Sequence, residues 1–321
     1  MQLNSKETDD FLVSGTAFYD AKGIPLAVNY SPNWFGLDVS FATSLNHREW
    51  NKTQLAKSLE WAKKNNKLKG EKFALNGEFL ESSDDAWDNL ILETKSKDAV
   101  FKSIRQLEKR GEKSPSRGLL FVGRPGTGKT KTGRVMLNEA DSTFIWVSSR
   151  DFRRPDPLKA LSLAFSMARD LAPSVLFIED VDTWLHGVAV DLLKTELDGV
   201  RQNTGMITVL TSNFPEKLPD ALLDRPGRFH HVIDFVLPGK AERREMIEKW
   251  AGDVDEETME DLIEKTDGFS GSHMKELVDF AKLIMDDDEV EIGEALLRSL
   301  QRLMEQKELI DQIRASKEDK G

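Results

Sequence analysis

Gly123-Arg-Pro-Gly-Thr-Gly-Lys-Thr130 is the stretch of sequence that decides the fold. It fits the pattern G-x-x-x-x-G-K-[ST] and lies between an apolar run at residues 118–123 and a predicted helix that begins at Lys129. In that setting the glycines let backbone N–H groups surround phosphate oxygens, and the helix N-terminus adds its dipole. Lys129 is predicted to reach the outer phosphates of ATP, and Thr130 a Mg²⁺ ion. The predicted nucleotide contacts in this stretch are Gly123, Pro125, Gly126, Thr127, Gly128, Lys129 and Thr130.

Downstream of this loop, apolar strands alternate with helices. Continuous apolar strands separated by helices are typical of a parallel sheet covered on both faces, so we predict an α/β core. After Pro238 the pattern becomes helical and predicts a separate lid. The predicted strands are residues 118–123, 143–148, 174–178, 206–210 and 231–237, and the predicted helices are 158–171, 188–198, 240–251, 256–265, 272–286 and 293–314.

The region before the core has a different pattern. Apolar runs at residues 11–19 and 24–30 flank Asp20-Ala-Lys-Gly23 and predict a hairpin, and residues 47–68 predict a helix. We recognise no catalytic motif there. An amphipathic helix is predicted at residues 89–110. The predicted domains are a small N-terminal α+β domain at 1–88, a nucleotide-binding α/β domain at 89–237 and a helical lid with a C-terminal helix at 238–321.

Two further strand ends carry polar side chains. Val175-Leu-Phe-Ile-Glu-Asp180 is an apolar strand that ends in two carboxylates, which at the edge of the sheet beside the loop would face the metal and the attacking water. We assign Glu179 to the metal shell and Asp180 to polarising the water, because adjacent residues at a strand end point to different sides. Asn213 follows the next apolar run and could orient the same water, although Asn also ends strands as a turn former.

Asp224-Arg-Pro-Gly-Arg228 places two arginines around a Pro-Gly turn. Planar guanidinium groups suit phosphate binding and stabilisation of transition-state charge. Two solvated surface arginines are the alternative.

The composition restricts the function further. Lys and Arg total 45 against 56 Asp and Glu, and the net charge of −11 disfavours generic nucleic-acid binding. The chain has no cysteine, which excludes disulfides and thiol catalysis. No apolar run approaches the roughly 18–20 residues of a spanning helix. The polar, acidic N-terminus lacks the pattern of a signal peptide, so we predict a cytoplasmic protein without a membrane span.

Taken together and in order, these motifs resemble those of the classical AAA ATPases over residues 89–315. Residues 191–199 are similar to the family's helix after the acid pair, residues 221–229 to its second region of homology, and residues 267–277 to the start of its sensor-2 helix. The resemblance implies that Asn213 is the sensor 1 residue and that Gly271 and Ser272 lie near the nucleotide. It also implies that Arg225 and Arg228 are arginine fingers acting on a neighbouring subunit of a homo-hexamer.

The sequence departs from the family pattern in two places. The family usually has Asp then Glu, whereas this chain has Glu179 then Asp180, an order similar to that of the mitochondrial Rieske-protein translocase branch. The aromatic–hydrophobic–glycine pore loop of unfoldases is absent after Ser148. The chain instead has Phe152, Arg153 and Arg154 followed by two prolines, which stiffen the segment and favour an acidic or phosphate-bearing partner.

The function predicted from the sequence is therefore hydrolysis of Mg-ATP by a ring that remodels a protein client. The client is predicted to be recognised by a specific acidic feature, and the chain is not expected to thread arbitrary unfolded proteins. A nucleic-acid-associated loader or motor is the first alternative, and a regulatory ATP-binding scaffold with little turnover is the second. The net charge disfavours the loader, and the intact set of catalytic residues disfavours the scaffold.

Overall fold

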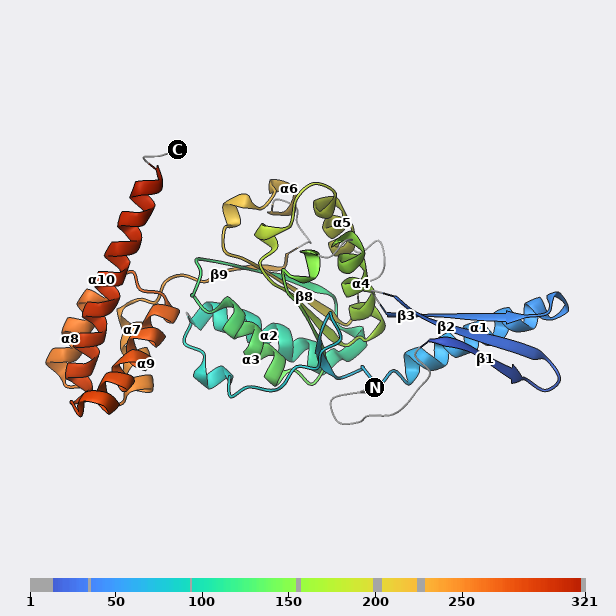
Figure 1. Ribbon diagram of the computed structural model, residues 1–321, viewed down its shortest axis with the longest axis horizontal. Helices are drawn as coiled ribbons and strands as arrows, with labels where there is room; N and C mark the ends of the chain where they lie inside the picture. Colours follow the sequence, from blue (N-terminus) through green and yellow to red (C-terminus); the bar gives the residue numbers. More distant parts are fainter. Residues whose placement is uncertain are drawn as a thin grey trace.

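A six-stranded parallel sheet forms the centre of the molecule, seen here in a computed structural model (Figure 1). The structure describes residues 14–33, 36–92, 94–153, 157–198, 204–223 and 229–318. The strand order is β4-β6-β7-β8-β5-β9. The strands are β4 (Lys72–Ala74), β5 (Arg117–Val122), β6 (Thr143–Val147), β7 (Ser174–Ile178), β8 (Met206–Ser212) and β9 (His231–Asp234).

Both faces of the sheet are buried, which is why most residues of its central strands are apolar. Successive side chains of a strand point to opposite faces. On β7, Phe177 belongs to the core under α2 (Thr94–Arg110) and α3 (Lys129–Glu139), and Ile178 belongs to the core under α4 (Pro157–Asp170) and α5 (Val188–Leu197). The predicted α/β core with helices on both faces is confirmed.

The C-terminal helices form a second body with its own apolar core. They are α7 (Lys240–Ala251), α8 (Glu256–Lys265), α9 (Gly271–Asp288) and α10 (Ile292–Glu318), and they lie beyond β9 in Figure 1. Arg243 on α7 is only 2% exposed, and its guanidinium donates hydrogen bonds to the carbonyls of Pro238 and Ile263, each at 2.9 Å. This side chain therefore ties the start of α7 to the linker and to α8.

The N-terminal part projects from the core (Figure 1). It contains an antiparallel sheet of β1 (Gly15–Asp20), β2 (Pro25–Asn33) and β3 (Gly36–Thr43), followed by α1 (Arg48–Lys64). The sequence analysis anticipated the hairpin of β1 and β2 and the helix, but not β3. Several large apolar side chains of this part are exposed, including Phe18, Leu45 and Trp61.

Two predicted boundaries differ from the structure. Strand β4 precedes the domain boundary predicted at residue 88, yet it pairs in parallel with β6 and so belongs to the large sheet. Helix α2 starts at Thr94 rather than at residue 89. Trp87–Asn89 is a single 3-10 turn in which Trp87 is buried and meets Phe101 edge-on. Trp87 therefore packs against α2 rather than forming part of it.

No helix in the part of the chain that the structure describes is long and apolar enough to cross a membrane.

The sheet predicts a sensitive position on α3. A Cβ atom at Gly133 would lie 2.4 Å from the ring of Phe177, which is fully buried. We expect Gly133→Ala to lower the free energy of unfolding by about 1–3 kcal/mol, because overpacking moves a ring with no free space around it. Gly293→Ala is the matched control, since the nearest atom to its Cβ is a flexible carboxylate oxygen 3.3 Å away. Urea denaturation measures both, and equal midpoints would contradict the packing argument.

Candidate nucleotide and magnesium site

The loop between β5 and α3 depends on glycine at two positions. Gly123 has φ 145°, and a Cβ there would lie 2.3 Å from the carbonyl oxygen of Phe235. Gly126 has φ 79°, and a Cβ there would lie 2.7 Å from the hydroxyl of Ser270 on the lid. Such φ values strain other residues. The loop can therefore adopt this shape, and approach both neighbours, only with glycine at these positions.

Lys129 lies beneath this loop. It is only 5% exposed, and its ammonium donates to the carbonyls of Gly123 at 2.6 Å and Arg124 at 3.0 Å. Burial lowers the pKa of Lys129, and the carboxylates of Asp180 and Asp182 oppose this shift. The ammonium thus supports the loop from inside and lies where phosphate oxygens would bind.

The two acids that follow β7 have different partners. The hydroxyl of Thr130 donates to Glu179 Oε1 at 2.9 Å, and the indole N–H of Trp146 donates to Glu179 Oε2 at 3.0 Å. The side-chain amide of Asn213 donates to Asp180 Oδ1 at 2.8 Å. Glu179 thus lies at the start of α3, and Asp180 lies beside the residue that follows β8.

Asp180 is held in an unusual conformation. Its φ of 49° and ψ of 50° are left-handed, and its backbone N–H donates to the hydroxyl of Thr211 at 2.9 Å. Burial, followed by the charge of Asp182, raises the pKa of Asp180. Asp182 also accepts a hydrogen bond from the backbone N–H of Asn213 at 2.9 Å. Sequence reasoning missed Asp182, which no motif distinguishes from an ordinary turn residue.

The donor set at Thr130 and Glu179 fits Mg²⁺, which prefers hard oxygen ligands. The described residues contain no group of three or more His, Cys, Asp and Glu side chains that could hold a metal by themselves. Magnesium is usually bound by one or two carboxylates together with substrate phosphates and waters. The oxygen ligands at Thr130 and Glu179 therefore fit a metal that the nucleotide would help to bind.

The lid reaches the same loop. The backbone N–H of Ser272 donates to the carbonyl of Gly126 at 3.1 Å. A Cβ atom added at Gly271 would lie 3.3 Å from the same carbonyl oxygen. The N-terminus of α9 is closed by a capping box in which Ser270 and His273 bond each other's backbone N–H groups. Gly271 and Ser272 therefore lie beside the predicted phosphate loop.

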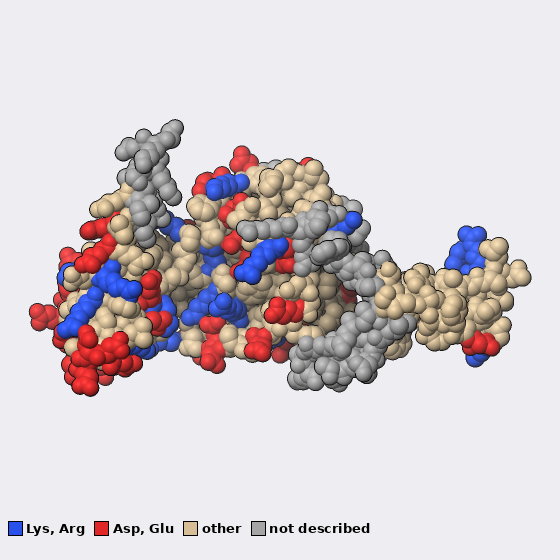
Figure 2. Space-filling model, in the orientation of Figure 1, with Lys and Arg blue, Asp and Glu red and all other residues tan. Residues whose placement is uncertain are grey.

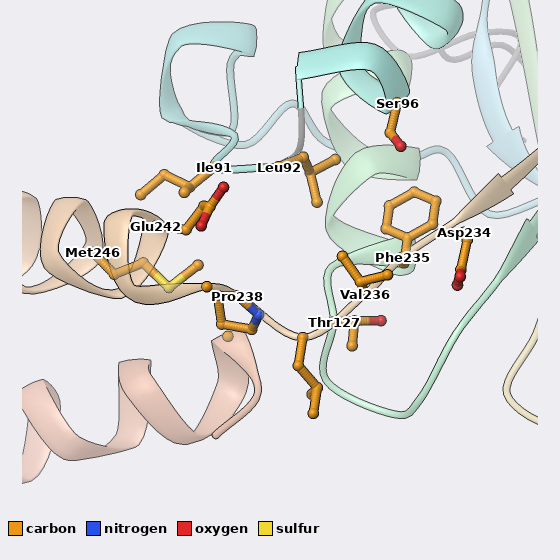
Figure 3. A pocket seen from close by; sticks show the side chains of 13 residues that line it. Ile91, Leu92, Ser96, Thr127, Asp234, Phe235, Val236, Pro238, Glu242 and Met246 are labelled. Atoms are coloured by element: carbon orange, nitrogen blue, oxygen red, sulfur yellow. The ribbon is translucent and has the colours of Figure 1, made fainter. Parts of the chain in front are cut away.

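Two neighbouring cavities lie between the core and the lid. One, of about 550 Å³, is lined by the loop from Pro125 to Lys131 together with Asp180, Asn213 and Trp250. The other, of about 270 Å³, is largely apolar (Figure 3). Thr127, Ile91, Met246 and Gly271 line both. The two together can hold a polar phosphate chain and a flat apolar ring.

The apolar cavity was not predicted from the sequence. In Figure 3, Ile91 and Leu92 come from the segment before α2, Phe235 and Val236 from the linker after β9, and Met246 from α7. These elements are far apart in the chain, and only the folded topology brings them together.

Several predicted residues lie outside the described part of the chain. These are Arg225 and Arg228, the predicted arginine fingers, and Arg154. Phe152, in the segment after β6, is described: it is 6% exposed and stacks on Trp184 with ring centroids 3.7 Å apart.

The fold and the loop define a P-loop nucleotide-binding domain, and comparison with known proteins shows what this domain is similar to. Residues 119–237 match the family described as "ATPase family associated with various cellular activities (AAA)". The chain is 34% identical over 203 residues to the ATP-dependent zinc metalloprotease FtsH 2 of Salinibacter ruber. This match covers 57% of this chain and 29% of that protein. It is 32% identical over 194 residues to a putative 26S proteasome regulatory subunit homologue of Methanocaldococcus jannaschii, covering 55% and 51%.

Solved structures agree on the fold. The crystal structure of the FIGL-1 AAA domain superposes with a TM-score of 0.55 at 23% identity, covering 68% of this chain and 83% of that one. The same domain in complex with ADP gives a TM-score of 0.52. This chain spans about half, or less, of the curated relatives it matches. Residues 119–237 therefore match an AAA ATPase domain, as the sequence resemblance implied.

The site makes a prediction for Lys129. Lys129→Ala removes the ammonium under the loop, and we expect it to abolish detectable ADP and ATP binding. It also leaves two carbonyls without their donor, so some loss of stability is expected, of about 1–3 kcal/mol. Titration calorimetry measures the affinity and thermal unfolding the fold. Lys102→Ala, in an exposed ion pair with Asp98, is the control. Unchanged affinity in Lys129→Ala would remove this residue from the site.

Proposed function

We propose that the chain hydrolyses ATP with Mg²⁺. The observation that carries the proposal is the division of the two acids, with Glu179 on Thr130 and Asp180 on Asn213, directly beside the phosphate loop. A solved AAA domain of similar fold is in complex with ADP, which supports nucleotide binding by this fold. ATP would place its phosphates on the loop and its base in the apolar cavity.

The proposed reaction is attack of water on the γ-phosphate. The water oxygen bonds to phosphorus, the bond to the bridging oxygen breaks, and ADP leaves. Asp180 accepts the hydrogen bond of the attacking water, and its raised pKa makes it a better proton acceptor than an ordinary Asp. Asn213 orients that carboxylate and the water. The metal, when bound, neutralises charge on the phosphate oxygens. Lys129 and the loop N–H groups hold the phosphates in line for attack.

Assembly into a homo-hexameric ring is part of the same proposal. It rests on the resemblance, which assigns Arg225 and Arg228 to the site of an adjacent subunit. The order Glu179 then Asp180 is similar to that of the Rieske-protein translocase branch. We therefore propose that the Mg²⁺ dependence of this chain resembles that of this branch. The cytoplasmic location predicted from the sequence belongs to the proposal as well, because the reaction needs a compartment supplied with ATP.

We further propose that the client is a protein. Two similar proteins are named as a metalloprotease and as a proteasome regulatory subunit homologue, and both names denote work on proteins. Charges of both signs are interspersed over the face of core and lid shown in Figure 2, which is unlike a basic nucleic-acid stripe. A nucleic-acid-associated loader or motor is therefore the less favoured alternative function.

The mode of client handling is proposed to be selective rather than threading. Phe152 is buried against Trp184, so in this conformation it offers no aromatic grip to an extended chain. The projecting N-terminal part instead exposes apolar side chains, with Phe18 81% and Trp61 68% exposed. We assign most client selectivity to that part.

The division of the two acids predicts a division of phenotypes. We expect Asp180→Asn to bind Mg-ATP normally and to lower the turnover number by about 10²–10⁴, the usual contribution of a general base. Asparagine keeps the acceptor for Asn213, so the geometry is preserved. Glu179→Gln should instead raise the Mg²⁺ concentration needed for half-maximal turnover. Phosphate-release assays over a Mg²⁺ series measure both. The reverse pattern would assign water activation to Glu179.

The ring predicts complementation between inactive variants. Arginine fingers contribute roughly 10³–10⁵ in rate in other phosphoryl-transfer enzymes, so Arg228→Ala should be nearly inactive. Mixing it with inactive Lys129→Ala should restore part of the turnover, because some interfaces then combine an intact loop with an intact finger. Activity per chain should also rise with protein concentration. Mixtures without activity, and turnover per chain that is flat on dilution, would show that the fingers do not act between subunits.

A further inference from the structure

Trp146 makes a contact that no motif accounts for. It lies on β6, one strand away from the acid pair, and its indole N–H donates to Glu179 Oε2 at 3.0 Å. We propose that Trp146 is the positioning residue that presents Glu179 to the magnesium ion, an inference that rests on the proposed Mg-ATP hydrolysis.

The carboxylate of Glu179 is held at both oxygens. Oε1 accepts from the hydroxyl of Thr130 at 2.9 Å, and Oε2 accepts from Trp146. One donor comes from α3 and the other from β6, so the plane of the carboxylate is fixed between two rigid elements. Each oxygen keeps further lone pairs for a metal-bound water or for the metal itself.

The need for this contact follows from the length of the side chain. Glu has one more methylene and one more rotatable bond than the Asp usual at this position in the family, so it loses more conformational freedom when it is fixed. Hydrogen bonds from second-layer groups orient metal-binding carboxylates and affect metal affinity. The indole N–H of Trp146 thus compensates for the longer acid by holding it in one rotamer.

Trp146 itself is well supported. Its backbone pairs with Ala74 of β4 on one side and with Phe177 of β7 on the other, and its carbonyl accepts from the N–H of Leu75 at 2.9 Å. Its ring packs against Phe177 with centroids 4.5 Å apart. The strand and the ring contact therefore fix the direction of the N–H.

The test separates the N–H from the ring. Trp146→Phe keeps an aromatic ring on β6 but removes the donor and makes the ring smaller, a change in size that Trp184→Phe reproduces. We measure ADP affinity by calorimetry, with and without Mg²⁺, on the full chain. In the wild type Mg²⁺ should tighten ADP binding. In Trp146→Phe we expect that Mg²⁺-dependent gain to fall about tenfold, while the affinity without Mg²⁺ stays unchanged.

Trp184→Phe is the matched control. Among the described residues, the buried indole N–H of Trp184 has no hydrogen-bond acceptor, and its ring stacks on Phe152. Its replacement should leave the Mg²⁺-dependent gain unchanged. In a Glu179→Asp background the shorter acid no longer reaches Trp146, so the additional Trp146→Phe change should have no further effect, which a double-mutant cycle detects.

Each outcome decides between the hypotheses. A wild type whose ADP affinity does not respond to Mg²⁺ contradicts the proposed function. A wild type that responds, with a folded Trp146→Phe that responds equally, overturns the role of Trp146 alone. If Trp146→Phe does not fold, ¹⁵N spectra of the tryptophan-labelled wild type and Glu179→Asp provide the test. One of the seven indole N–H signals should shift on loss of its acceptor, and no shift overturns the proposal.

Discussion

The site depends on the parallel pairing of β5, β7 and β8. Val122 at the end of β5 is in register with Ser212 at the end of β8, and Ile178 of β7 is in register with Leu210 of β8. The three strands therefore end at the same edge of the sheet, and the loop, the acid pair and Asn213 follow directly. Their buried apolar side chains hold this register, because a shift by one residue would turn each core side chain toward the wrong face. The strands thus position the residues of the candidate site, which lie just beyond the strand ends.

The lid adds a second constraint, since the cavity lies between two bodies rather than within one. The contact of Ser272 with Gly126 and the shared lining by Met246 join α9 and α7 to the loop. The guanidinium of Arg243 at the start of α7 donates to the carbonyl of Pro238, so the first helix of the lid is bonded to the linker that precedes it. A nucleotide that fills both cavities contacts both bodies at once. Its binding free energy would therefore depend on their relative position, and a change of nucleotide would then favour a different position of the lid.

The sequence predicted features that depend on neighbouring residues better than features that depend on contacts between distant segments. The phosphate loop and most strands of the core were predictable, because each corresponds to a continuous local sequence pattern. Strand β4 was not, because Lys72–Ala74 is too short for periodicity and gains its identity only by pairing with β6. The apolar cavity and the contact of Trp146 with Glu179 were missed for the same reason: both join segments that only the topology brings together. The two arginines of residues 224–228 remain a sequence prediction, because they lie outside the described residues.

In the inverted acid pair, the direction of the backbone determines which neighbour each acid contacts. Phe177 points to the α3 side of the sheet and Ile178 to the α4 side, so alternation returns Glu179 to the α3 side, where Thr130 is located. The N–H of Glu179 still bonds the carbonyl of Val147, so the strand geometry continues to this residue. Asp180 then leaves the strand in a left-handed conformation and turns toward Asn213. In this chain the acid in the first position therefore meets Thr130, and the acid in the second position meets Asn213. A Glu in the first position brings an extra rotatable bond with it, and in this structure the indole of Trp146 bonds one carboxylate oxygen while Thr130 bonds the other.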